Sequence, residues 1–218
     1  MFKKAVPGVC LCLAFLTLAC ASLAAQVPQI VITQKSPVIR PADTPAVGLT
    51  EIYSNLGSET DAFDDGLSYQ ITGPGNLLWG KGYLAMPFIP ANDSTAKEVL
   101  IALGNFGSDD RGTIGLFTDA NGVPGKPLKV WTTAHFPQEG TCCQLVVLQD
   151  ANGVALRGGS QYWIVAGTNR NQRNSQYQWS FVWNDATGKV AFLNGNTNDQ
   201  WFPYTDNVAA FAVYGTIP

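Results

Sequence analysis

The regular alternation of short apolar runs with turn residues is the feature that most constrains the fold of this sequence. From Ala46 onward, each apolar run ends at a cluster of Asp, Asn, Gly or Pro. The pentapeptide Asp-Ala-Asn-Gly-Val occurs at 119–123 and again at 150–154, and a variant of it begins at Asp185. In such turns the Asp and Asn side chains cap the backbone, while Gly supplies a positive φ. No window shows sustained helical periodicity, so the pattern predicts strands.

The expected strands are short and closely spaced. They are residues 47–53, 67–71, 82–89, 97–104, 112–118, 127–133, 143–149, 161–168, 177–184, 189–193 and 207–215. Strands of this size that follow one another without helices predict an all-β, antiparallel β-sandwich. The run from Val99 to Leu103 is apolar at every position, so both faces of that strand should be covered and the strand should be central in its sheet.

One expected strand carries a row of aromatic residues on a single face. The row consists of Tyr177, Trp179, Phe181 and Trp183. It forms either the inner wall of the sandwich or a platform on which sugar rings stack, since large aromatic side chains serve both roles. Trp201 and Tyr204 lie in the turn-rich stretch 194–207 and are expected to meet solvent. The candidate ligand-binding residues are therefore Trp179, Trp183, Trp201 and Tyr204.

The N-terminus has the layout of a secretory signal peptide. Lys3 and Lys4 precede an uncharged apolar stretch, 9–19, and small residues then lead to a cleavage site after Ala24. The stretch is short for a membrane span. We therefore expect a leader at 1–24, a Pro-containing arm at 25–45, a single domain at 46–218 and no membrane span in the mature form. Cleavage before Cys20, which would give a lipoprotein, and an uncleaved anchor are the alternatives.

Length and charge narrow the class of protein further. The residues left after the leader suffice for one well-packed domain. The net charge is −3 and Lys and Arg form no run, so nucleic acid is excluded as an expected partner. We expect a monomer that is secreted or periplasmic.

Two adjacent cysteines, Cys142 and Cys143, remain after the leader. Export favours the oxidised state, which predicts a vicinal disulfide; one buried and one exposed thiol is the alternative. A nucleophile or zinc site with His135 would need better spacing, because neighbouring residues on a strand point to opposite faces. Glu139, the nearest charge, would also raise a thiol pKa rather than lower it. No catalytic residue is predicted.

Acidic residues cluster between the first two expected strands, 47–53 and 67–71. They are Glu59, Asp61, Asp64 and Asp65. A flexible loop with several carboxylates is what Ca²⁺ requires, so calcium is the one candidate cofactor. Solvated turn carboxylates are the alternative, because the spacing of a full calcium-binding loop is missing.

Four segments, in this order, resemble the choice-of-anchor R domain of secreted bacterial proteins. They are Glu51–Gly57, Leu84–Pro90, Gly115–Asp119 with Gly122–Gly125, and Gln161–Val165. The resemblance implies export and a jelly-roll-like sandwich, and it brings no catalytic residues. Members often continue into a sorting anchor, for which we see no motif after Tyr214.

These observations favour an exported, non-catalytic module with a binding or structural role. Its expected partner is an extracellular polymer or surface component, and carbohydrate is the candidate ligand. A secreted jelly-roll hydrolase that uses an Asp/Glu pair is the alternative. A groove with two carboxylates would favour the enzyme, and an exposed Trp201 would favour binding.

Overall fold

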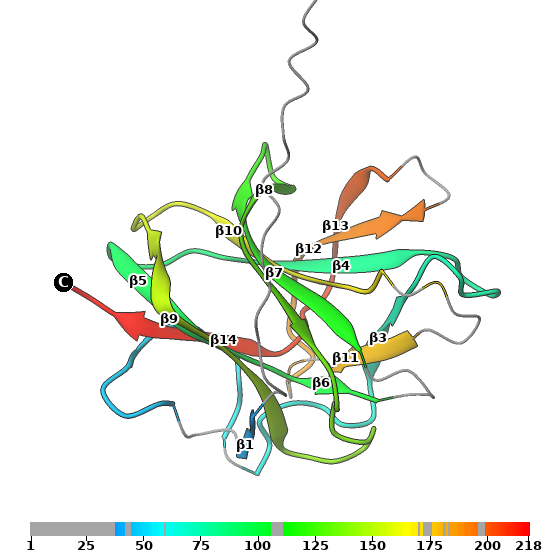
Figure 1. Cartoon of the computed structure of the whole chain (residues 1–218), viewed down its shortest axis with the longest axis horizontal. Helices are drawn as coiled ribbons and strands as arrows, with labels where there is room; N and C mark the ends of the chain where they lie inside the picture. The colour runs from blue at the N-terminus through cyan, green and yellow to red at the C-terminus, as the bar shows by residue number, and fades with distance from the viewer. Residues whose placement is uncertain are drawn as a thin grey trace, which may run out of the picture.

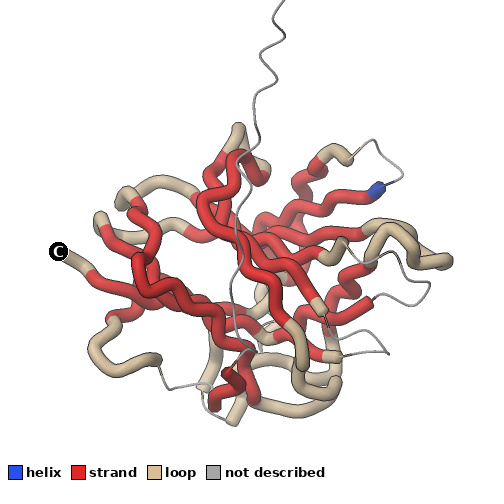
Figure 2. The backbone as a smooth tube through the Cα atoms, viewed as in Figure 1, coloured by secondary structure: helices blue, strands red, loops and turns tan. Residues whose placement is uncertain are grey.

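The structure is a computed structural model that describes residues 38–41, 45–58, 60–105, 111–169, 171, 176–180, 182, 184–195 and 199–218. In this part of the chain, fourteen strands form two sheets, all strand pairs are antiparallel, and no α-helix is present (Figures 1 and 2). The all-β sandwich expected from the turn pattern is thereby confirmed. The chain passes repeatedly from one sheet to the other, as it does in jelly-roll-like sandwiches.

The smaller sheet has five strands. In spatial order they are β1 (Val38–Pro41), β9 (Gln144–Leu156), β5 (Ser94–Ile101), β14 (Phe211–Thr216) and β2 (Thr50–Ser54). The central strands β5 and β14 pair along almost their whole length, from Phe211 opposite Ile101 to Thr216 opposite Thr95. Residues 99–101 of the apolar run belong to β5, so the central position expected for the run is confirmed for these residues.

The larger sheet is curled and has nine strands. Seven follow one another as β6 (Leu103–Gly104), β11 (Gln176–Ser180), β3 (Ser68–Thr72), β4 (Gly82–Phe88), β10 (Tyr162–Gly167), β7 (Gly112–Asp119) and β8 (Pro124–Thr133). The remaining pair, β12 (Thr187–Asn194) and β13 (Trp201–Asn207), joins the sheet where β12 pairs with β4. β13 therefore lies at an edge.

The main core fills the space between the sheets. Alternate residues of facing strands supply it, among them Leu84 and Met86 from β4 and Val99 and Ile101 from β5, all at most 1% exposed. Phe211 of β14 stacks on Tyr53 with ring centroids 5.1 Å apart. The period-2 alternation of apolar residues is what selects this face.

The outer face of the smaller sheet is covered as well. A second buried cluster joins Leu100, Leu145 and Ala212 of this sheet to Ala62 and Phe63 of the β2–β3 connection. This cover explains why β5 reads as apolar on both faces. It also fixes the acidic segment against the sheet.

The repeated pentapeptide adopts two different structures. At 119–123 it makes a two-residue hairpin between β7 and β8, with Asn121 at φ 57° and Gly122 at φ 87°, as the turn chemistry predicts. At 150–154 it does not separate two strands, and that expectation is wrong. There it bulges out of β9, because the residues on both sides of it pair with the same strand, β5, and only Lys97 stands opposite the bulge.

Most of the N-terminal segment, for which we expected a leader and an arm, lies outside the described residues. The leader and the candidate lipidation residue Cys20 lie outside the described residues. Within the segment 25–45, which we expected to be an arm, β1 pairs with β9 as an edge strand. Helices long and apolar enough to cross a membrane are not found among the described residues.

Candidate functional site

An apolar groove of about 240 Å³ lies on the outer face of the larger sheet, opposite the core. Five strands and β13 supply its aromatic and aliphatic lining, which includes Tyr83, Phe117, Val165, Leu193 and Trp201. An outer sheet face that carries only solvent contacts is normally polar. A concave apolar surface in that place marks a candidate binding site.

Several lining residues pack on the cluster of Trp163, which is fully buried although it points away from the core, and which does not itself line the groove. Phe117 and Trp201 pack against its cluster from the two sides. Gly167 leaves room for the ring of Tyr83, since a Cβ at this glycine would lie 2.7 Å from that ring. The small size of Gly167 thus allows the ring of Tyr83 to line the groove.

Asp119 holds Trp163 in place from the end of β7. Its carboxylate accepts hydrogen bonds from Trp163 Nε1 at 2.8 Å, from Gln161 Nε2 at 2.5 Å and from the backbone N–H of Gly122 at 3.0 Å. Partial burial acts to raise the pKa of this carboxyl, but the three hydrogen bonds and the charge of Lys189 outweigh it, and the pKa lies below its usual value. The turn residue of the first pentapeptide is therefore also the support of the groove.

Replacing Asp119 with Asn should cost about 1 kcal/mol of unfolding free energy at neutral pH, because charge-assisted hydrogen bonds are stronger than neutral ones. A lowered folded-state pKa stabilises the fold above the unfolded pKa of about 4, and the contribution disappears as the pH falls through the folded pKa. The difference between the wild type and Asp119→Asn in urea unfolding should therefore shrink from pH 5 to pH 3. Asp185→Asn, at an exposed turn, controls for the lost charge. A difference that stays constant with pH would contradict the network.

A polar hollow of about 270 Å³ continues the groove. Its lining includes Arg111, Thr132 and Thr168, and it shares Thr113 and Asn169 with the apolar part. Together the two volumes fall within the range of roughly 300–1,000 Å³ that is usual for small-molecule sites. One end of the site thus offers rings, and the other offers hydroxyl, amide and guanidinium groups.

Tyr83 lies where the two parts meet. Its hydroxyl is directed at the carbonyl oxygen of Thr168, 3.1 Å away, and at the side-chain oxygen of Asn169. Burial raises the pKa of Tyr83 to about 12, and the charge of Asp199 adds to the shift. The hydroxyl therefore remains a protonated donor at neutral pH. Lys81 lies over the same ring, 4.9 Å from its centroid.

The four aromatic residues predicted as ligand contacts are not brought together. Trp201 is half-buried and lines the groove. Tyr204 is exposed further along β13 and is not among the lining residues. Trp179 is corrected: it is fully buried in the core and donates to the Ala210 carbonyl, so it is out of reach of a surface ligand. Trp183 lies outside the described residues.

Sequence reasoning missed Tyr83 and Phe117. Both lie on strands whose alternate residues are core, and the sequence carries no sign of which face looks outward. The one available signal is Gly115 and Gly167, which open space beside those two rings. Glycine inside a strand often marks such a close approach.

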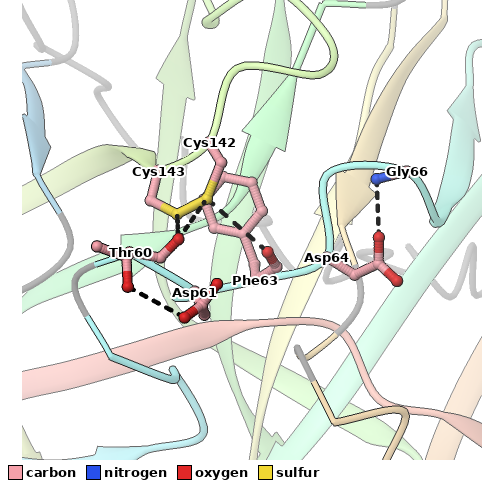
Figure 3. Close-up of a disulfide and its surroundings, with 7 residues drawn as sticks. All are labelled: Thr60, Asp61, Phe63, Asp64, Gly66, Cys142 and Cys143. Atoms are coloured by element: carbon pink, nitrogen blue, oxygen red, sulfur yellow. Dashed lines mark hydrogen bonds between the residues drawn. A yellow bond between two sulfur atoms is a disulfide. The ribbon is translucent and has the colours of Figure 1, made fainter.

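Cys142 and Cys143 are joined by a disulfide at the start of β9 (Figure 3). The pair lies against the β2–β3 connection, with Cys143 Sγ 3.4 Å from the carbonyl oxygen of Thr60. His135 is exposed and lies in the preceding loop. The cysteines thus contact the segment that covers the smaller sheet, and they do not belong to the groove.

The acidic residues of that segment face different partners. Asp61 accepts from the Thr60 hydroxyl, whereas Asp64 accepts from the backbone N–H groups of Gly66 and Leu67 (Figure 3). Asp65 is exposed, and Glu59 lies outside the described residues. No group of three or more His, Cys, Asp or Glu side chains with metal-site geometry occurs in the described part of the chain. The calcium site stays a prediction.

Comparison with known proteins gives no further guide to the groove. The chain matches no family model, and no curated protein or solved structure is significantly similar to it. The resemblance to the choice-of-anchor R domain therefore stays a prediction.

Proposed function

We propose that this protein is an exported, non-catalytic module that binds carbohydrate in the groove on the outer face of its larger sheet. The observation that carries the proposal is the pairing of an aromatic hollow with a polar one at Tyr83. A sugar ring has an apolar C–H face and a rim of hydroxyl groups. The C–H face can stack on Trp201 or Phe117, and the hydroxyl groups can form hydrogen bonds with Asn169 and Arg111.

The choice of a binding module over the glycosidase alternative rests on the lining. Among the described residues that line the two hollows there is no Asp or Glu. Glycoside hydrolysis requires a pair of carboxyl groups that flank the scissile bond. Asp119 lies outside this lining, and its oxygens accept from Trp163, Gln161 and Gly122.

Trp201→Ala should weaken binding of the preferred oligosaccharide about fivefold or more, because a stacked aromatic anchor commonly contributes more than about 1 kcal/mol. The preferred oligosaccharide is first identified on an array of bacterial and plant glycans. Affinities are then measured by isothermal titration calorimetry.

The matched control is Phe202→Ala. Phe202 is the next residue of β13, is 46% exposed, and does not line the groove, so its loss should leave the affinity unchanged. An array without any bound glycan, or equal losses for both variants, would refute the proposal. Release of reducing ends from the bound glycan would favour the hydrolase instead.

A further inference from the structure

Three consecutive apolar side chains protrude from the connection between β3 and β4. Leu77, Leu78 and Trp79 are 70%, 83% and 61% exposed. We call these three residues the apolar tip. The connection projects beyond the end of the larger sheet, at the right of Figure 1. The tip does not line the carbohydrate groove.

The turn that carries the tip is well defined. Asn76 is only 7% exposed, and its side-chain oxygen accepts from the backbone N–H groups of Leu78 and Trp79, each at 3.0 Å. The N–H of Gly80 donates to the Asn76 carbonyl, and the Thr72 hydroxyl donates to that of Gly80. The two leucines and the tryptophan are therefore held outward by a hydrogen-bonded turn.

The clustering of the tip residues sets them apart from the other large apolar side chains that face solvent. Those occur singly along the chain, except that Phe202 and Tyr204 lie on one face of β13. They are Val47, Leu67, Ile89, Leu128, Phe202, Tyr204 and Ile217. Contiguous exposed apolar residues, in contrast, mark a surface that meets a membrane or another protein.

We propose that the apolar tip inserts into the interface of a lipid bilayer. These three neighbours on one tight turn are each more than half exposed, and a fluid apolar medium can surround them all. Indole side chains such as that of Trp79 favour the boundary between headgroups and acyl chains, and leucine favours the acyl region. The contact would be peripheral and would involve no membrane-spanning element.

The turn that carries the tip has few charged residues, as is expected of a segment that enters an apolar medium. From Gly73 to Gly82 the sequence contains no Asp or Glu, so insertion of this turn dehydrates no carboxylate of its own. Its one cation, Lys81, is already paired with Asp199 at 2.8 Å. Binding should therefore depend little on salt or on anionic lipid.

The test is sedimentation of the protein, as recovered after export, with phosphatidylcholine vesicles and with vesicles that also contain phosphatidylglycerol. The expected result is similar binding to both. The variant with serine in place of Leu77, Leu78 and Trp79 should show a partition coefficient lower by about tenfold or more, given the apolar area withdrawn from the bilayer. Its melting temperature should not fall, because the three side chains pack little in the folded state.

Two controls keep the result specific. Serine at Val47, Ile89 and Phe202 removes the same number of exposed apolar side chains elsewhere and should leave partitioning unchanged. In vesicles of brominated lipid, tryptophan emission should be quenched in the wild type, and Trp79→Phe should abolish the quenching while it keeps the fold. Absence of vesicle binding, equal partitioning of the wild type and the tip variant, or quenching that survives Trp79→Phe would overturn the proposal and favour a protein partner.

Discussion

Trp179→Ala should lower the free energy of unfolding by about 3–5 kcal/mol, the usual cost of truncating a large buried aromatic residue. Trp179 is fully buried, its indole N–H donates to the Ala210 carbonyl at 2.9 Å, and its ring meets that of Phe211 edge-on at 6.0 Å. Truncation would leave a cavity between the sheets and an unpaired carbonyl. Urea unfolding at neutral pH measures the loss.

The outcome also decides between the two interpretations of the aromatic row. If Trp179 belonged to a stacking platform at the surface, its removal would change the stability by no more than about 0.5 kcal/mol. Trp79→Ala provides that comparison, since Trp79 is 61% exposed. Equal stability of the two variants would mean that Trp179 is not in the core.

Gly215→Ala should destabilise the smaller sheet by about 1–3 kcal/mol or more, the range that is usual when an extra methyl group is forced into a packed site. A Cβ at Gly215 would collide with the backbone carbonyl of Thr95 and lie 2.9 Å from the side chain of Ile52. The collision is with the backbone of the adjacent strand, β5, so a change of side-chain rotamer cannot relieve it. The register shift of β14 at Tyr214–Gly215 is what brings the two strands this close.

Gly66→Ala is the matched control for that variant. A Cβ there would meet the nearest atom, in the side chain of Asp64, at an ordinary 3.4 Å. Thermal unfolding should therefore show a lowered midpoint for Gly215→Ala alone. Equal midpoints for both variants would show that β14 and β5 do not approach as closely as described.

The sequence predicted the strands of this fold better than their connections. Period-2 alternation and apolar runs located β4, β5 and β10 to within a few residues, because burial of one or both faces leaves a direct trace in the residue types. The sequence indicates turns throughout 194–207, whereas in the structure β13, which contains Pro203, occupies the second half of that stretch. Proline is tolerated in a strand only at an edge, and β13 is an edge strand that pairs with β12 alone.

The two copies of one pentapeptide show why local turn chemistry does not settle topology. Asp119–Val123 reverses the chain and lets β8 pair with β7. Asp150–Val154 has the same letters, yet the residues before and after it continue along β5. The strand that is available for pairing decides the outcome, and this information is distant in the sequence.

The candidate site was predicted only at Trp201. The sequence suggested its exposure through the surrounding turn residues, but gave no reason to join it to Tyr83 or Phe117, which come from strands far away in the chain. An aromatic residue on a strand that is buried on one side can face the core or the outside, and a shift of one residue reverses the choice. Trp179 and Trp201 are both candidate ligand contacts in the sequence, yet they lie on opposite faces of the same sheet.

The place of β14 has a consequence for how the protein folds while its chain is being delivered. This strand is the latest in the described chain, yet it lies between β5 and β2 in the smaller sheet. When a chain emerges N-terminus first, β5 lacks one of its two neighbours and β2 lacks its one neighbour in this sheet until residues 211–216 arrive. Such late, long-range closure slows folding and exposes strand edges to neighbouring chains. The interval between emergence of β5 and emergence of β14 is thus the period in which this protein would be most open to pairing with other chains.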